Sequence, residues 1–209
     1  MTRLAILNYG MGNLRSVAKA CEHVGVEAVV TADPEEAGAA DGVILPGVGA
    51  FPKAMGPVRE RGFERLLAER VRDGRPVLGI CLGMQLLFGS STELGGCEGL
   101  GLLDGEVSGL RAPGLKVPHI GWSPVRWERE SALVAGIPPE TPFYFVHSFA
   151  ARPARGDTLG TAAYGERFAC AVEHGSLYGV QFHPEKSSAA GLALLSNFAG
   201  ICAVSRVAA

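Results

Sequence analysis

The chain has 209 residues, of which 19 are basic and 21 acidic, so its formal net charge is −2. This length favours one domain over residues 1–209, and such a chain buries roughly 70% of its surface without the help of a disulfide or a metal. The basic residues form no block, which excludes a general binder of the nucleic-acid backbone. The five cysteines include no C-x-x-C pair, which argues against a zinc site and against a disulfide framework.

Five free thiols are typical of a reducing compartment, and no uninterrupted apolar run approaches the roughly 18 residues of a membrane span. We therefore expect a soluble, cytoplasmic protein with no membrane contact. Glycine is enriched, at 29 of 209 residues, and it lies beside apolar runs rather than in polar stretches. This arrangement favours tight turns between strands and helices.

Short apolar runs alternate with helical stripes through the first 81 residues. The predicted strands are apolar runs that end at or near glycine, at residues 4–7, 26–30, 42–45 and 77–80. The predicted helices are stretches in which apolar residues recur three and four apart, at residues 14–21 and 63–71. Strand–helix alternation of this kind predicts a parallel sheet covered on both faces.

From about Glu106 the pattern changes to short β-like runs that follow one another with glycine or proline between them. These runs are at residues 143–146, 168–173 and 177–182, and a last helix is predicted at about 189–203. The predicted fold is therefore α/β: an open, mostly parallel sheet flanked by helices on both faces, with an antiparallel addition in the C-terminal half.

The segment Gly79-Ile80-Cys81-Leu82-Gly83 has the form G-x-C-x-G, a thiol version of the nucleophile elbow. Small residues two before and two after the nucleophile let a strand and a helix approach closely. The turn would place the Cys81 sulfur at a helix N-terminus, where backbone N–H groups favour the thiolate. The alternative interpretation is a buried cysteine that lies between two glycines by chance.

A base for that thiol is offered by His183 in the segment Gln-Phe-His-Pro-Glu. Residues i and i+2 of an extended chain point the same way, so Glu185 can orient one imidazole nitrogen of His183 while the other faces a thiol. His23 and His174 are interpreted as surface residues. Gly10-x-Gly12 lacks the third glycine of a dinucleotide loop, and we expect no cofactor and no metal.

The segments G-I-C-L-G-M-Q around Cys81 and Q-F-H-P-E-K around His183 and Glu185 together resemble the class I (triad) glutamine amidotransferases. The resemblance covers nearly the whole chain. Four further stretches resemble the glutaminase subunits of imidazole glycerol phosphate synthases: N-Y-G-M-G-N at 8–13, P-G-V-G-A-F at 46–51, K-V-P-H-I-G-W at 116–122 and F-Y-F-V-H-S-F at 143–149.

The resemblance implies that Cys81 attacks the side-chain amide of glutamine, releases ammonia and leaves a γ-glutamyl thioester, which water activated by His183 then hydrolyses. It also implies that the ammonia passes to a separate cyclase subunit, which forms imidazole glycerol phosphate and aminoimidazole carboxamide ribotide in histidine biosynthesis. That cyclase is normally a (β/α)₈ barrel of about 250 residues, for which this chain has no room. We therefore expect a heterodimer.

Positions that match the family motifs take three further predicted roles. The oxyanion hole is assigned to the backbone of Leu82, Val48 and Gly49. Glutamine binding is assigned to Gly49, Gln85, Ser148 and Phe149, although Gln85 could instead pack locally. The partner interface is assigned to Asn13, Lys116, His119, Trp122 and Lys186.

Two positions depart from the family pattern: Ser123 replaces an expected asparagine, and Phe149 replaces an expected tyrosine. Three alternative functions stay open at this point. The first is an amidotransferase of another pathway, such as anthranilate or pyridoxal phosphate synthesis, although the stretches at 46–51 and 116–122 argue against it. The second is a free-standing hydrolase of γ-glutamyl peptides. The third is a non-catalytic binding or regulatory subunit, which the intact Cys81, His183 and Glu185 make a poor fit.

Overall fold

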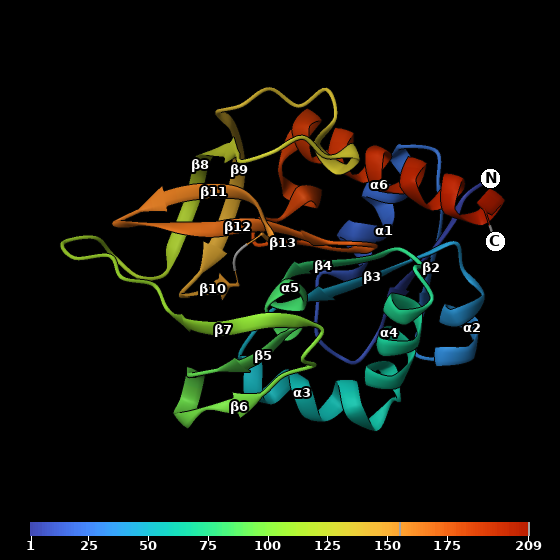
Figure 1. Ribbon diagram of the computed structural model, residues 1–209, viewed down its shortest axis with the longest axis horizontal. Coiled ribbons are helices and arrows are strands. Elements are labelled where there is room, and N and C mark those ends of the chain that lie inside the picture. The colour runs from blue at the N-terminus through green and yellow to red at the C-terminus, as the bar shows by residue number, and fades with distance from the viewer. Residues whose placement is uncertain (155, 209) are drawn as a thin grey trace.

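The computed structural model describes residues 1–154 and 156–208, and a parallel sheet forms the centre of this part of the chain (Figure 1). Its strands stand in the order β2-β1-β3-β4-β13, each parallel to its neighbours. They are β1 (Arg3–Leu7), β2 (Glu27–Thr31), β3 (Gly42–Gly47), β4 (Val77–Cys81) and β13 (Leu177–Val180). The four strands predicted in the first 81 residues are confirmed.

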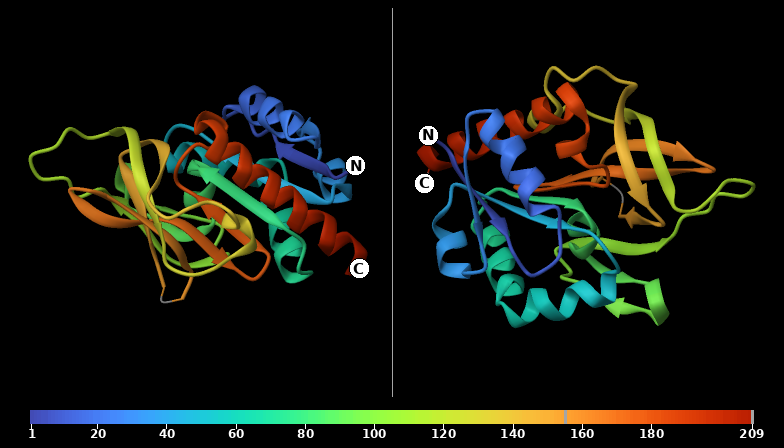
Figure 2. Two further views of the ribbon diagram at one scale, coloured as in Figure 1. Left: turned by 90° about the horizontal axis from the view of Figure 1, so that it is seen from above. Right: turned by 180° about the vertical axis from the view of Figure 1, so that it is seen from behind.

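Helices cover both faces of the parallel strands, as expected (Figures 1 and 2). One face carries α1 (Leu14–His23) and α6 (Ser188–Ala208), and the other carries α2 (Pro34–Ala39), α3 (Phe51–Glu60) and α4 (Phe63–Arg72). Alternate residues of β1 separate the two layers: Leu4 and Ile6 join the core cluster of α1 and α6, and Ala5 and Leu7 join the other cluster. The sequence pattern predicted α1, α4 and α6 but missed α2 and α3.

The second half of the chain extends this sheet with mostly antiparallel strands. They are β5 (Phe88–Ser91), β6 (Cys97–Glu98), β7 (Leu103–Gly109), β8 (His119–Trp127), β9 (Thr141–His147), β10 (Phe149–Pro153), β11 (Thr158–Tyr164) and β12 (Glu166–His174). The assignment of 177–182 to the antiparallel addition was partly wrong. Strand β13 pairs antiparallel with β12 but parallel with β4, so it joins the two parts of the sheet.

Helix α6 is long enough to span a membrane, although no uninterrupted apolar run in the sequence approaches that length. Among the described residues, it is the one helix that is long and apolar enough, over Ser188–Ser205, to cross a membrane by length and composition. A count of uninterrupted apolar residues missed it because Ser and Asn interrupt the run. Leu194, Leu195 and Phe198 are fully buried against the protein core, so we interpret α6 as a core helix.

Candidate active site

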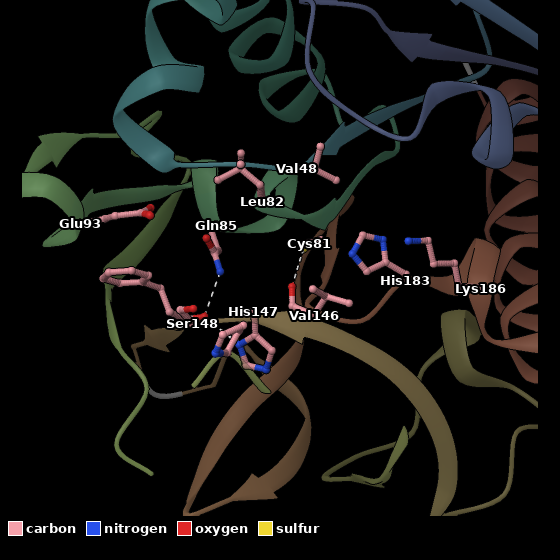
Figure 3. A pocket seen from close by; sticks show the side chains of 13 residues that line it. Val48, Cys81, Leu82, Gln85, Glu93, Val146, His147, Ser148, His183 and Lys186 are labelled. Carbon is pink, nitrogen blue, oxygen red and sulfur yellow. Dashed lines mark hydrogen bonds between the residues drawn. The ribbon is translucent and has the colours of Figure 1, made fainter. Parts of the chain in front are cut away.

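The predicted catalytic residues meet at the carboxyl ends of neighbouring parallel strands, where α/β sheets commonly bind ligands. Cys81 is the last residue of β4, between β3 and β13. Val180 of β13 stands beside Ile80 of β4, so the chain that continues from β13 to His183 passes next to the cysteine (Figure 3). Sheet register thus brings together two residues about a hundred positions apart in the sequence.

Cys81 occupies a strained turn between β4 and the short helix α5 (Leu82–Leu86). Its φ is 55° and its ψ −113°, a conformation that L residues rarely adopt. The two flanking glycines are sterically required. A Cβ on Gly79 would lie 2.7 Å from the backbone nitrogen of Met84, and one on Gly83 would collide with the carbonyl oxygen of Leu45. These contacts give the physical reason for the G-x-C-x-G pattern.

His183 and Glu185 form the predicted pair, with Nδ1 of His183 2.8 Å from Oε1 of Glu185. Burial lowers the pKa of His183, but hydrogen bonds to Cys81 and Glu185 and the charges of both outweigh burial and raise it to about 10. The Glu185 side chain is fully buried, and the amide of Asn13 also donates to its Oε1 at 3.1 Å. The histidine is therefore held as an imidazolium between the Cys81 sulfur and the Glu185 carboxylate.

A cavity of about 320 Å³ opens in front of Cys81 and takes in most of the predicted site (Figure 3). Its lining comprises Val48, Gly49, Cys81, Leu82, Gln85, Glu93, Pro118, Val146, His147, Ser148, Phe149, His183 and Lys186. All residues assigned to the oxyanion hole and to glutamine binding are among them. Glu93, whose Oε2 accepts a hydrogen bond from the backbone nitrogen of Phe51 at 2.8 Å, was not predicted.

The backbone assigned to the oxyanion hole packs tightly against the elbow. Leu82 begins α5, so its N–H has no acceptor in an earlier helical turn. Gly49 has a φ of 106°, a conformation suited to glycine. A Cβ on Gly47 would lie 2.5 Å from the Tyr9 hydroxyl and 2.9 Å from the nitrogen of Gly83. Only glycine at 47 lets β3 approach the elbow this closely.

Gln85 lines the cavity, but its amide hydrogens are already engaged. Its Nε2 donates to the carbonyl of Phe149 at 3.0 Å and to Oε1 of Gln181 at 2.8 Å, so its own carbonyl oxygen is the group left for a ligand. Gln181 is fully buried and its Nε2 lies 3.6 Å from the Cys81 sulfur. Gln181 was not predicted, although it stands two residues before His183 on the same face of an extended chain.

The residues assigned to a partner surface lie in different environments. Trp122 is 53% exposed, and Lys116 and Lys186 are also exposed. Asn13 is only half-buried, and its amide contacts Glu185 of the triad. His119, by contrast, is 1% exposed, so its side chain is not part of the exposed surface. His119 and Trp122 are three apart in a strand, so they point to opposite faces of β8.

Comparison with known proteins agrees with this geometry. The family described as "Glutamine amidotransferase class-I" matches residues 5–201. Among curated proteins, the imidazole glycerol phosphate synthase subunit HisH of Moorella thermoacetica is 53% identical over 199 residues, covering 95% of this chain and 94% of the relative. The subunit of the same name from Bacillus cereus strain AH187 is 48% identical over 198 residues, with the same coverage.

Solved structures share the fold at lower identity. A putative GMP synthase subunit from Thermoplasma acidophilum has a TM-score of 0.74 at 21% identity and covers 100% of this chain and 97% of its own. PurLQS from Thermotoga maritima has a TM-score of 0.71 at 18% identity and covers 99% of both chains.

The fold and the cysteine elbow with its His–Glu pair define an amidotransferase of the class I, triad type, and the match over residues 5–201 places the chain in that class. At 48–53% identity over nearly the whole chain, it belongs within that class to the family of HisH subunits of imidazole glycerol phosphate synthase.

Proposed function

We propose that this protein is the glutaminase that supplies ammonia to the separate cyclase subunit of imidazole glycerol phosphate synthase, in histidine biosynthesis. The cyclase then forms imidazole glycerol phosphate and aminoimidazole carboxamide ribotide. The observation that carries the proposal is the strained Cys81 elbow facing an imidazolium, His183, inside a cavity large enough for one amino acid. The relatives named above support the choice of pathway.

In the first step the Cys81 thiolate attacks the side-chain amide carbon of glutamine. Negative charge develops on the amide oxygen, and the N–H groups of Leu82 and of the Val48–Gly49 turn stabilise it; one such donor typically contributes about 2.7–4 kcal/mol. His183, whose pKa is raised to about 10, is protonated and delivers its proton to the leaving nitrogen. Ammonia departs and the γ-glutamyl thioester remains.

In the second step a water molecule enters where ammonia left. Neutral His183, held in orientation by Glu185, takes a proton from this water, and the resulting hydroxide attacks the thioester carbon. The same backbone donors stabilise the second oxyanion. Collapse breaks the C–S bond, releases glutamate and restores the thiolate–imidazolium pair. Every step uses this chain's own groups and water, so we propose no cofactor.

Glutamine recognition is assigned to the part of the cavity away from His183. The carboxylate of Glu93 lines it and complements the α-ammonium of glutamine. The Gln85 carbonyl oxygen offers a second acceptor. The Ser148 carbonyl accepts from the Leu110 nitrogen, and the Phe149 carbonyl accepts from Gln85 and His147. Any contact from this segment to the ligand carboxylate therefore comes from its N–H groups.

The cyclase is proposed to dock over the mouth of this cavity. Trp122, Ile120 and Val117 are exposed apolar side chains near Pro118 of the lining, at 53%, 60% and 47% exposure. The Trp122 ring meets Tyr144 edge-on, and the ammonium of Lys186 lies 5.9 Å from the centre of the Tyr144 ring. An aromatic centre with a basic rim suits a protein interface, and docking here lets ammonia pass without meeting solvent.

We also infer that residues 1–209 form one domain that acts in the cytoplasm. The sheet that runs from β2 through β13 into the antiparallel strands supports a single domain, because β13 belongs to both parts.

The test is glutamate release from glutamine by this chain alone, with the cyclase subunit, and with the cyclase plus its ribonucleotide substrate. Cys81→Ala is the matched inactive control. We expect strong stimulation by the loaded cyclase that vanishes in the variant. Activity that depends on Cys81 but ignores the cyclase would point to another synthase or to a free-standing hydrolase. A Cys81 that a glutamine-like diazoketone fails to label within the complex would favour a non-catalytic subunit.

A further inference from the structure

Two buried histidines face each other across the β8–β9 pair. His119 of β8 and His147 of β9 are register partners, and both are almost fully buried, at 1% and 6% exposure. Nδ1 of His119 lies 3.0 Å from Nε2 of His147. The outer nitrogens are also paired: Nε2 of His119 with the hydroxyl of Ser123 at 2.9 Å, and Nδ1 of His147 with the carbonyl of Phe149 at 2.9 Å.

The chemistry of these groups fixes the direction of every hydrogen bond. A carbonyl only accepts, so the Nδ1 of His147 carries a proton. Burial, outweighing the hydrogen bond to Phe149, lowers the pKa of His147 to about 4, so its ring is neutral and its Nε2 accepts from Nδ1–H of His119. Burial also lowers the pKa of His119, whose Nε2 accepts from the hydroxyl of Ser123.

The same Phe149 carbonyl is the junction with the nucleophile. It accepts from His147 on one side and from Gln85 on the other, at 2.9 and 3.0 Å. Gln85 also donates to Gln181, whose Nε2 lies 3.6 Å from the Cys81 sulfur. Hydrogen bonds therefore connect Ser123 to Cys81 without a break.

Packing alone gives no reason for imidazoles here. The ring of His119 is stacked between Phe145 and Tyr164, with centroid distances of 5.0 and 4.1 Å, an apolar sandwich that a phenylalanine ring would also fill. Burying a polar ring is unfavourable unless its nitrogens are paired. The pairing of all four nitrogens, which ends at the substrate cavity that His147 lines, indicates a role in positioning the site.

We propose that His147, oriented by His119 and Ser123, is a positioning residue of the glutaminase: it fixes the Phe149 carbonyl and, through Gln85 and Gln181, the hydrogen bond to the Cys81 sulfur. The inference rests on the proposed function. It also connects β8, whose outer face presents Trp122, with the nucleophile. The path ends at the neutral Nε2–H group of Gln181, which donates to the Cys81 sulfur. This hydrogen bond stabilises the thiolate, the reactive form of Cys81.

Variants of three residues along this hydrogen-bonded path, His147, His119 and Ser123, test the proposal. His147→Leu removes the donor to Phe149, whereas His147→Asn retains a donor at the place of Nδ1. His119→Phe keeps the aromatic sandwich and removes both hydrogen bonds. Ser123→Ala removes one hydroxyl and is the smallest change, which guards against loss of the fold. His174→Phe, which alters an exposed histidine paired with Asp157, is the matched control.

Two readouts are compared on folded protein. The first is kcat and KM for glutamine in the complex with the cyclase and its ribonucleotide. The second is the rate of Cys81 alkylation by iodoacetamide in a Cys97→Ser background, because Cys97 is the most exposed of the described cysteines. Alkylation does not depend on glutaminase activity, so this arm remains informative even if the wild-type chain releases no glutamate.

We expect both kcat and the alkylation rate to fall about 10-fold in His147→Leu, the scale of one hydrogen bond to a charged group, with smaller losses in His119→Phe and Ser123→Ala. His147→Asn should recover most of the loss. Wild-type alkylation rates and kcat in the Leu, Phe and Ala variants would overturn the proposal. Equal losses in His147→Leu and His147→Asn, accompanied only by a lower Tm, would overturn it as well and assign the histidines to core packing.

Discussion

The nucleophile elbow and the β8–β9 pair contribute differently to one cavity, which the elbow lines directly and the strand pair lines only through β9. They are also specified in different ways. The elbow is local: Cys81 and the glycines at 79 and 83 lie within five residues, and each glycine is required by a backbone contact. The β8–β9 pair is not local, because His119 acts through a partner 28 positions away. A turn that sterically requires glycine at fixed positions can be recognised as a motif in the sequence. Pairing between two strands shows in the sequence only as alternation of buried and exposed residues.

The largest expected effect is the loss of glutaminase activity when the thiol of the elbow is removed. Cys81→Ala should reduce glutamate release by about 10⁴-fold or more, because no other thiol among the described residues lines the cavity. Cys97→Ala is the control, since that thiol is partly exposed but lies on β6, away from the cavity lining. Release is measured in the complex with the cyclase. Comparable activity in Cys81→Ala and wild type would remove Cys81 from the mechanism.

Glu185→Gln tests the orienting carboxylate at nearly constant volume. We expect kcat to fall about 10²–10⁴-fold, because the imidazolium loses its buried counter-charge. The pKa of His183, raised to about 10, should move toward 6.5 in the variant, which NMR titration of the imidazole can follow. A His183 pKa that stays near 10 would contradict this role for Glu185.

The raised pKa of His183 also makes the free energy of unfolding depend on pH. A histidine whose pKa is raised on folding stabilises the folded state fully below its unfolded pKa, near 6.5, and this contribution is lost as the pH rises through about 10. The difference in unfolding free energy between wild type and Glu185→Gln should therefore be largest below pH 6.5 and shrink toward pH 10. Chemical denaturation at several pH values measures it; a constant difference would speak against the linkage.

Gly83→Ala tests whether the elbow sterically requires glycine at position 83. A Cβ at this position meets the carbonyl of Leu45, so the elbow must shift, and we expect a loss of about 3 kcal/mol in unfolding free energy. Gly56→Ala is the control: a Cβ on this exposed glycine of α3 would have nothing within 4 Å, and the change should stabilise the helix by up to about 1 kcal/mol. Similar Tm values for the two variants would show that the elbow tolerates a side chain.

The parts that the sequence predicted are those with local causes. The elbow, the pairing of His183 with Glu185 and the first four strands of the parallel core, β1 to β4, all follow from spacing within a few residues. Helix α3 was missed because two prolines interrupt its pattern, and β13 was misassigned because only tertiary context gives it one parallel and one antiparallel neighbour. The inward face of His119 was also missed, although the alternation of buried and exposed residues along β8 follows a period of two.

An effect smaller than that of Gly83→Ala is expected on the outward face of β8. Trp122→Ala should weaken binding of the cyclase by about 2 kcal/mol, roughly 30-fold in Kd, because a half-exposed tryptophan in contact with Tyr144 has the properties of an interface anchor. Val204→Ala is the matched control: this side chain is 72% exposed on α6, whose end lies on the opposite side of the molecule from β8 and β9 (Figures 1 and 2). Calorimetry of the purified subunits measures both affinities. If the two variants bind equally well, the cyclase docks elsewhere. If only Trp122→Ala loses affinity, β8 carries the partner contact on its outer face and, on its inner face, the histidine that pairs with His147 of the cavity lining.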